Sequence, residues 1–447
     1  MFVRVTFLNS LVMGLVAGAS SLSAQTVSRS ESAGLIEAAS NPESAVAAPT
    51  GCSDSRLAHF DELIGKFLAE RAIPGAALAV TRHGRLVYAR GFGFADVDSR
   101  TPVQPDSLFR IASISKPITA VAVMQLVEQR RLSLDDKVFS LLAIEPHIVM
   151  GTRPDPRLQQ ITVRHLLQHT AGWDRDKSYD PMFRSVKIAE TLGVPAPAMP
   201  CHIIRYMAGQ PLDFTPGERY AYSNMGYSLL GRVIEHVTGE AYDDYVRRCV
   251  LAPVGACRTR LGFSFPECRA NGEVTYYETK ASPGKSVFAH NLGDAVPWQY
   301  GGWCLEAMDS HGGWIASAVD LVRFASAFDD PKNSRLLGED SIRTMFQPSD
   351  HAAGKKPDGE PNPFFYGCGW FVRSAGEGKT TVWHTGSLDG TSTLLVRRHD
   401  GLNWAILFNT RNSGRKDPPS REIDVQLHQA ADAVREWPDY DLFTRFE

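Results

Sequence analysis

Strand-like segments lie near both ends of this chain of 447 residues, and helical segments fill the middle. Apolar, β-prone runs at 75–81 and 86–92 are separated by Arg82-His83-Gly84, which predicts a hairpin. The β pattern returns near the C-terminus, before a helix predicted over 423–435, in runs at 365–372, 380–383, 392–398 and 404–408. The strands of the two ends must therefore pair into one sheet, with the helical block as an insertion.

This order predicts an α+β fold of two lobes with an active site in the cleft between them. The sheet and its flanking helices are expected over about 56–132 and 330–435, and an all-helical lobe over about 133–329. Residues 436–447 are expected to form a C-terminal tail.

The N-terminus has the layout of a secretory signal peptide over residues 1–24. A basic start at Arg4 precedes an apolar stretch at 7–19 and small residues at 19–24. A retained membrane anchor is the alternative, but the stretch is short and lacks charged residues on both sides. Residues 25–55 read as a flexible leader, and the expected location is periplasmic or secreted, with no stable membrane span after cleavage.

The net charge of −3 provides no basic face, which argues against a nucleic-acid partner. Export would permit disulfides among the seven cysteines, and an odd number leaves at least one unpaired. The expected partners are the four in the middle of the chain: Cys249, Cys257, Cys268 and Cys304. No Cys-x-x-Cys occurs, so neither a zinc site nor another cofactor is predicted.

The segment Ser113-Ile114-Ser115-Lys116 opens an apolar stretch, 118–126, that predicts a buried helix. Residues three apart share a helix face, so Ser113 and Lys116 point the same way. The helix N-terminus carries partial positive charge and free N–H groups, which suit a nucleophile that becomes an oxyanion. Ser-x-x-Lys alone is a weak signal, and its weight depends on partner motifs downstream in the chain.

Two such motifs occur. In Tyr222-Ser223-Asn224, before a predicted helix, the phenol can shuttle a proton and the amide can hold a carbonyl. The alternative is that Asn224 caps the helix and Tyr222 only packs. His384-Thr385-Gly386-Ser387 comes after the strand at 380–383, where a substrate can lie along the strand edge; the alternative is a simple strand end and turn.

Together, in this order, the three motifs resemble those of the serine β-lactamase and penicillin-binding-protein superfamily, in its class C-like branch of exported hydrolases and esterases. The resemblance covers about Arg56 to Arg435, and it implies an antiparallel β-lactamase/transpeptidase-like sheet. Secondary signatures support it at 163–172, 214–218 and 312–317.

The resemblance implies a role for each motif residue. Ser113 would be the acylated nucleophile, Lys116 would accept its proton or orient the base, and Tyr222 would serve as base and then as acid. Asn224 would bind the acyl side of the substrate. His384, Thr385, Gly386 and Ser387 would line the substrate, and the N–H groups of Ser113 and Ser387 would form the oxyanion hole.

One residue departs from the family pattern. Penicillin-recognising members usually carry lysine where His384 stands, and a largely neutral histidine grips a carboxylate more weakly. The predicted function is an exported serine hydrolase for a small-molecule or peptide ester or amide. A true penicillin-binding D,D-peptidase or class C-like β-lactamase is the first alternative, and a non-catalytic binding protein on the same fold is the second.

Other sequence signals are weaker. His165 and His169 lie four apart on a predicted helix but lack the glutamate of a zinc protease. Residues 376–380 resemble part of a phosphate loop, yet a strand comes next, so a hairpin turn is predicted. Residues 174–176, Asp-Arg-Asp, read as a solvated loop.

Overall fold

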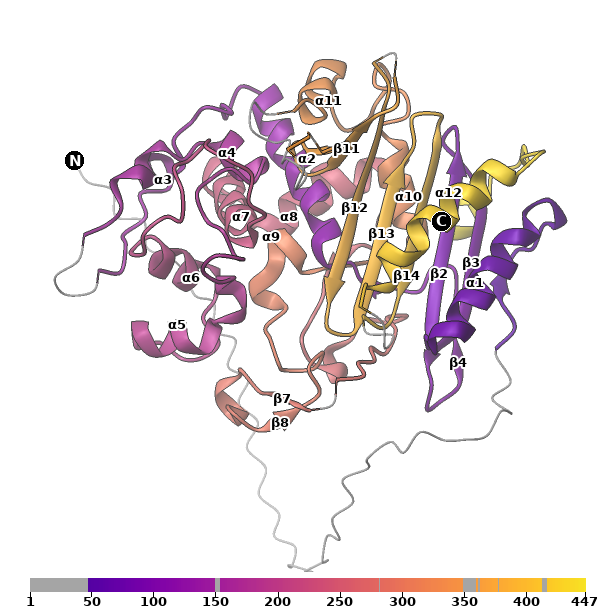
Figure 1. Cartoon of the computed structure of the whole chain (residues 1–447), viewed down its shortest axis with the longest axis horizontal. Helices are drawn as coiled ribbons and strands as arrows, with labels where there is room; N and C mark the ends of the chain where they lie inside the picture. The colour runs from indigo at the N-terminus through magenta and orange to yellow at the C-terminus, as the bar shows by residue number, and fades with distance from the viewer. Residues whose placement is uncertain are drawn as a thin grey trace, which may run out of the picture. The chain divides into compact units, whose positions relative to one another are not determined.

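One antiparallel sheet joins the two ends of the chain (Figure 1). The computed structural model describes residues 47–148, 153–280, 282–348, 359–360, 362–376, 378–411 and 416–447. Within them nine strands share this sheet, in the order β1-β3-β2-β14-β13-β12-β11-β10 with β4 beside β3. Their bounds are β1 Thr50–Gly51, β2 Gly75–Arg82, β3 Arg85–Asp96, β4 Thr101–Pro102, β10 Phe365–Tyr366, β11 Phe371–Ser374, β12 Thr380–Leu388, β13 Thr391–Arg397 and β14 Leu402–Phe408. The predicted fold class is confirmed, since β2 pairs with β14 and sets Ala79 opposite Ala405.

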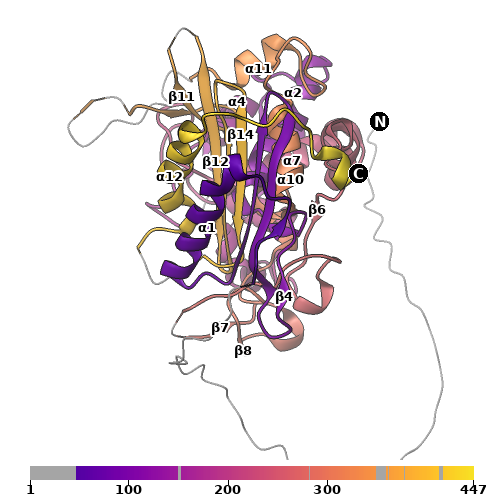
Figure 2. The same ribbon diagram turned by 90° about the vertical axis from the view of Figure 1, so that its right-hand side faces the viewer.

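The strands at the centre of this sheet are covered on both faces, which explains their continuous apolar runs. Side chains alternate along a strand, so Leu78 packs with α1 (Ala58–Arg71) and α12 (Pro419–Ala433), while Ala77 faces the opposite side. Helix α10 (Ala318–Ser326) packs there against β2 and β14. Figure 2 shows α1 and α12 together on one face of the sheet, away from α10.

The region expected to be all-helical, 133–329, departs from that prediction in two ways. Helix α10 belongs to the sheet lobe, because its apolar face packs on the strands. Short strands also occur here and before it: β5 Phe109–Arg110, β6 Arg260–Leu261, β7 Gly284–Lys285, β8 Ala295–Val296 and β9 Trp314–Ala316. The other helices, which include two outside this region, are α2 Ser115–Glu128, α3 Val138–Leu142, α4 Val163–Leu167, α5 Ser185–Leu192, α6 Pro200–Met207, α7 Asn224–Thr238, α8 Tyr242–Val246, α9 Asp309–Gly312 and α11 Glu339–Met345.

Helix α2 is buried along nearly its whole length, as its apolar sequence predicts, and it contacts α7, α8 and α9. Two helix ends show why the sequence folds this way locally. Ser317 caps α10 by accepting the N–H of Asp320 at 3.0 Å, and Gly239 ends α7 with φ of 75°.

The chain ends depart from the predicted boundaries. The predicted signal peptide lies outside the described residues, but Thr50 and Gly51 of the expected leader form β1 against β3. In the expected tail, Leu442 is buried and its N–H bonds to Leu86 O at 2.9 Å. Strand pairing thus holds Thr50 and Gly51 on the sheet, and burial together with a backbone hydrogen bond holds Leu442 on the core.

The single strand predicted over 365–372 is wrong. The chain reverses within it, so β10 and β11 pair with each other and Tyr366 lies opposite Phe371. Gly369 lies in the turn with φ of 86°, a conformation that favours glycine.

The predicted disulfides are also wrong, because all seven cysteines are free thiols in the structure. Cys304 is buried, whereas Cys257 and Cys268 are exposed. No helix in the described part of the chain is long and apolar enough to cross a membrane.

Candidate active site

Ser113 lies in a tight turn, η2 (Ala112–Ile114), immediately before α2. Ala112 has φ of 47°, a left-handed conformation that costs a residue with a Cβ about 1–3 kcal/mol. The Ser115 hydroxyl closes the turn by donating to Ala112 O at 2.7 Å, and Ser115 is fully buried. Ser113, in contrast, lines a cavity, so the structure separates the two neighbouring serines.

The turn is fastened to the sheet by two threonines of β13. Thr391 donates to Arg110 O at 2.7 Å, and Thr393 donates to Ile111 O at 3.1 Å. Strand β12 passes so close that a Cβ at Gly386 would lie 2.1 Å from Ile111 O. The glycine of the third motif is therefore what lets this strand approach the Ser113 turn.

Lys116 is fully buried, and its Nζ has three oxygen neighbours. These are Asn224 Oδ1 at 2.8 Å, His311 O at 2.8 Å and Ser113 Oγ at 3.1 Å. Burial lowers the pKa of Lys116 well below its usual range; the charge of Arg175 lowers it further, and Asp180 opposes this. The shift favours the neutral amine of Lys116 over its charged form.

The three neighbours of Lys116 direct its lone pair. A neutral amine has two hydrogens and one lone pair. The amide oxygen of Asn224 and the carbonyl oxygen of His311 can only accept, so they take the two hydrogens. The lone pair is left for the third neighbour, the Ser113 hydroxyl, which can donate.

Asn224 is oriented by a buried carboxyl group. Asn224 is the first residue of α7 rather than the helix cap, and Asn224 Nδ2 donates to Asp180 Oδ2 at 2.6 Å. Asp180 also accepts the N–H of Met182 at 3.1 Å as the cap of a short helical turn. Burial raises the pKa of Asp180, and these two hydrogen bonds oppose the rise. Asp180 thus turns the amide nitrogen of Asn224 toward itself and its oxygen toward Lys116.

Tyr222 lies between two cationic side chains and an imidazole. Lys116 Nζ is 4.8 Å and Arg175 Cζ 4.6 Å from its ring centroid, and the His169 ring is 4.3 Å away. Burial raises the pKa of Tyr222, while a hydrogen bond with Ser113 and the charge of Arg175 oppose the rise. The protonated phenol is therefore the resting form and can donate.

His384 is buried and both of its ring nitrogens have protein partners. Nδ1 donates to Thr385 O at 2.7 Å, which leaves Nε2 to accept from the Tyr366 hydroxyl at 3.0 Å. Burial, aided by the charge of Lys116, lowers the pKa of His384 to about 3. The ring is neutral and offers no charge to a substrate carboxylate.

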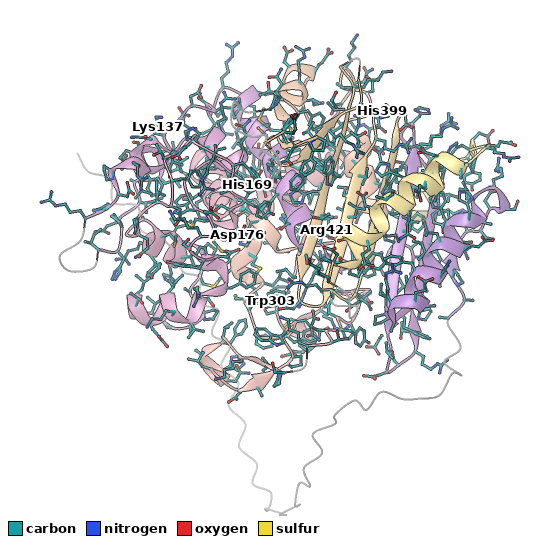
Figure 3. The ribbon with its side chains drawn as sticks, viewed as in Figure 1. Lys137, His169, Asp176, Trp303, His399 and Arg421 are labelled. Carbon is teal, nitrogen blue, oxygen red and sulfur yellow. The ribbon has the colours of Figure 1, made fainter. Side chains whose placement is uncertain are left out.

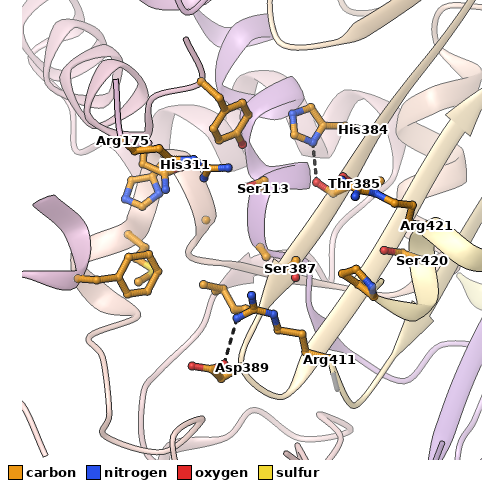
Figure 4. A pocket seen from close by; sticks show the side chains of 18 of the residues that line it. Ser113, Arg175, His311, His384, Thr385, Ser387, Asp389, Arg411, Ser420 and Arg421 are labelled. Atoms are coloured by element: carbon orange, nitrogen blue, oxygen red, sulfur yellow. Dashed lines mark hydrogen bonds and ion pairs between the residues drawn. The ribbon is translucent and has the colours of Figure 1, made fainter. Parts of the chain in front are cut away.

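These groups border a cavity of about 460 Å³ (Figure 4). The described part of β11 pairs with β12 only up to Trp383, so residues 384–388 have one strand partner, β13, among the described strands. In Figure 3, His169 and Asp176 lie on the helical side and Arg421 lies on the α12 side. Lining residues from the three motifs are Ser113, Tyr222, Asn224, His384, Thr385 and Ser387.

The structure thus brings together the residues of all three motifs. Lys116 is buried beneath the cavity, in contact with Ser113, and Gly386 lies where β12 comes closest to the Ser113 turn. Sequence reasoning missed Asp180, His169, Tyr366 and Arg175. Asp180-Pro181 has a helix-start signature, but that signal marks a cap, not a site.

The two histidines considered for a zinc site have different hydrogen-bond partners in the structure. His165 Nδ1 accepts the N–H of Thr162 at 3.3 Å within a capping box, whereas His169 Nδ1 accepts the N–H of Ser223 at 3.2 Å. Burial lowers the pKa of His169 well below its usual range, so it packs beside Tyr222 as a neutral ring.

A two-lobed α+β fold that brings a serine, a buried lysine and a tyrosine together at one cavity has the fold and site layout of a β-lactamase-type protein. The chain belongs to the Beta-lactamase family, whose model matches residues 60–428. The resemblance to the serine β-lactamase and penicillin-binding-protein superfamily is therefore confirmed.

Individual relatives agree with this assignment. "Protein flp" of Staphylococcus aureus (strain COL) is 27% identical over 337 residues, which are 75% of this chain and 59% of that protein. "Penicillin-binding protein 4*" of Bacillus subtilis (strain 168) is 27% identical over 389 residues, 86% of this chain and 77% of that protein. The octameric penicillin-binding protein homologue from Pyrococcus abyssi has a TM-score of 0.64 at 26% identity, over 85% of this chain and 79% of that one. The chain therefore spans 59% of the length of the first of these relatives.

Proposed function

We propose that this protein hydrolyses an ester or amide bond through an acyl-enzyme on Ser113, with Lys116 as the acceptor of the serine proton. The observation that carries the proposal is the arrangement at Lys116 Nζ, where two acceptor-only oxygens hold the hydrogens and the third neighbour is Ser113 Oγ at 3.1 Å. A serine hydroxyl is a poor nucleophile unless such a base lies beside it.

Tyr222 is the proposed acid. Its phenol is protonated at rest and contacts the Ser113 hydroxyl, so it lies where the leaving group departs. The backbone N–H groups of Ser113 and Ser387, which both border the cavity, are the proposed oxyanion hole, and Asn224 is the proposed contact of the acyl side.

The proposed substrates are neutral esters and amides, because His384 is uncharged and its nitrogens are engaged by Tyr366 and Thr385. One observation favours a second candidate, a D,D-peptidase or class C-like β-lactamase. Arg411 and Arg421 line the far side of the cavity. They pair with Asp389 at 3.1 Å and with Asp417 at 3.0 Å, and a carboxylate-bearing substrate would compete with these aspartates for the two cations. Export to the periplasm or the medium, based on the predicted signal peptide, is part of the proposal.

The test is covalent labelling. After incubation with a fluorophosphonate, mass spectrometry is expected to find the adduct on the Ser113 peptide, and Ser113→Ala is expected to abolish it. An adduct on Ser115 or Ser387 would refute the assignment of the nucleophile. A panel of short-chain esters, D-amino-acid amides and a chromogenic cephalosporin then separates the two candidates by their kcat/KM values.

A further inference from the structure

Arg175 occupies a position that its sequence context does not suggest. Residues 174–176 read as a solvated loop, yet Arg175 Cζ lies 4.6 Å from the ring centroid of Tyr222, and the side chain lines the cavity. Figure 4 shows Arg175 beside His311, on the side of the cavity opposite Arg421. Arg175 and Asp176 are exposed, as predicted, but the Arg175 side chain also lines the cavity.

The loop that carries Arg175 is tied to the segment that carries Tyr222. Asp174 accepts from Arg219 Nη2 at 2.8 Å, and the N–H of Asp174 donates to Asp213 Oδ2 at 2.8 Å. Arg219 lies three residues before Tyr222, so the ion pair joins the two backbones at this point. The arginine is thus carried by a fixed turn rather than by a free loop.

The groups facing Tyr222 come from several elements. They are Ser113 of η2, Lys116 of α2, His169 after α4, Arg175 and Asp180 of the following loop, Tyr220 beside it, Tyr227 of α7, Tyr366 of β10 and His384 of β12. His169 and His384 are neutral, because burial lowers the pKa of each. Positive charge near the phenol therefore comes from Arg175, and from Lys116 once it has gained the serine proton.

We propose that Arg175 is a positioning residue of this site, whose guanidinium stabilises the Tyr222 phenolate that forms when the leaving group is protonated. The inference rests on the proposed function. In acylation the Ser113 Oγ–acyl bond forms, the bond to the leaving group breaks, and Lys116 gains the serine proton. Tyr222 gives its proton to the leaving oxygen or nitrogen, so the site then holds an ammonium and a phenolate. In the family pattern a lysine stands at the position of His384. In this chain Arg175 supplies a positive charge instead, from another wall of the cavity.

The experiment uses leaving groups that need protonation to different degrees. Acetates of para-nitrophenol, phenol and ethanol share one acyl group, and para-nitrophenolate departs without a proton. We expect Arg175→Gln to lower kcat/KM about 10-fold for ethyl acetate and less than about 2-fold for para-nitrophenyl acetate, because a nearby opposite charge shifts an acid by about one to three pH units. Arg175→Lys is expected to retain most of the wild-type ratio.

Two controls separate this effect from others. Lys177→Gln removes a charge from the same loop, where the lysine is exposed and donates to Asp213 O at 2.9 Å, and the ratio is expected to stay at the wild-type value. In a Tyr222→Phe background, Arg175→Gln is expected to leave the ratio unchanged, since the phenolate is absent. The Arg175 side chain is 43% exposed, so high salt is expected to reduce the Arg175 effect.

An equal loss for all three acetates would overturn the inference, because a structural defect, or a change in the pKa of Lys116, slows every acylation alike. So would a leaving-group effect that persists in the Tyr222→Phe background. If the wild-type protein carried no adduct on Ser113, the proposed function itself would fail. An adduct on Ser113 with an unchanged ratio in Arg175→Gln would refute this inference alone.

Discussion

Substituting Gly386 by alanine tests whether the close approach of β12 to the nucleophile turn sets the reaction geometry. The added Cβ would lie 2.1 Å from Ile111 O and 2.2 Å from Thr393 Oγ1. Real Cβ atoms stay beyond 3.0 Å, and Ile111 O is a backbone atom held by the Thr393 hydroxyl. The strand and the turn must therefore separate by about 1 Å.

The magnitude comes from that displacement. Overpacking of this kind costs about 1–3 kcal/mol of unfolding free energy, which lowers Tm by about 1–4 °C for a domain of this size. The larger effect is kinetic, because the N–H groups of Ser113 and Ser387 lie on the two segments that move apart. A misplacement of about 1 Å costs about 100-fold in rate, so we expect acylation to fall about 100-fold while the protein stays folded.

The assay is the rate of acylation by para-nitrophenyl acetate, measured beside a thermal melt. Gly65→Ala is the matched control, since a Cβ at Gly65 in α1 meets nothing within 4 Å. It is expected to raise the unfolding free energy by about 0.5–1 kcal/mol and to leave the rate unchanged. A Gly386→Ala variant that kept its rate within about 2-fold would refute the reasoning, whatever its Tm.

Three other predictions concern the proton path and substrate choice. Lys116→Ala and Tyr222→Phe are each expected to lower kcat about 10²- to 10⁴-fold without unfolding the protein. Near-full activity of Tyr222→Phe on every accepted ester would mean that the phenol only packs. Asp180→Asn removes the charge that raises the pKa of Lys116, so the neutral amine is expected to persist to lower pH. The acidic limb of the kcat/KM profile then moves to lower pH, and a shift to higher pH would contradict this sign. His384→Lys is expected to move the kcat/KM ratio of a chromogenic cephalosporin to a neutral ester about 10- to 100-fold toward the cephalosporin, and an unchanged ratio would mean that this position does not face the carboxylate.

Much of the fold could be predicted because its signals are local. Alternating and continuous apolar runs marked β2, β3, β13 and β14, and a serine three residues before a lysine marked the start of α2. Residue order cannot give distances, and the expected disulfides failed for that reason: Cys249, Cys257, Cys268 and Cys304 are near in sequence but free in the fold. The prediction of one strand over 365–372 failed because the chain reverses at Gly369. This reversal is a tertiary feature as much as a local one.

The residues of the candidate site also fall into two groups, those with a local sequence signal and those without one. Ser113, Tyr222 and His384 stand in short motifs whose spacing is itself the signal. Asp180 and Arg175 stand in a loop without periodicity, and their part in the site depends on contacts with Asn224 and Tyr222 from distant segments. The part that such single residues play in the site can be inferred only from the structure, which shows the loop beside the cavity.

The pairing of β2 with β14 has a consequence for the order of folding. Leu78 lies opposite Ile406, so the middle of the sheet joins two strands that lie far apart in the sequence. Until the final strands emerge, the edge of β2 has no partner, and closing so long a loop makes this pairing slow. The sheet can therefore close only after β14 has been synthesised. A late-closing sheet suits a protein that crosses a membrane unfolded, the route that the predicted signal peptide implies.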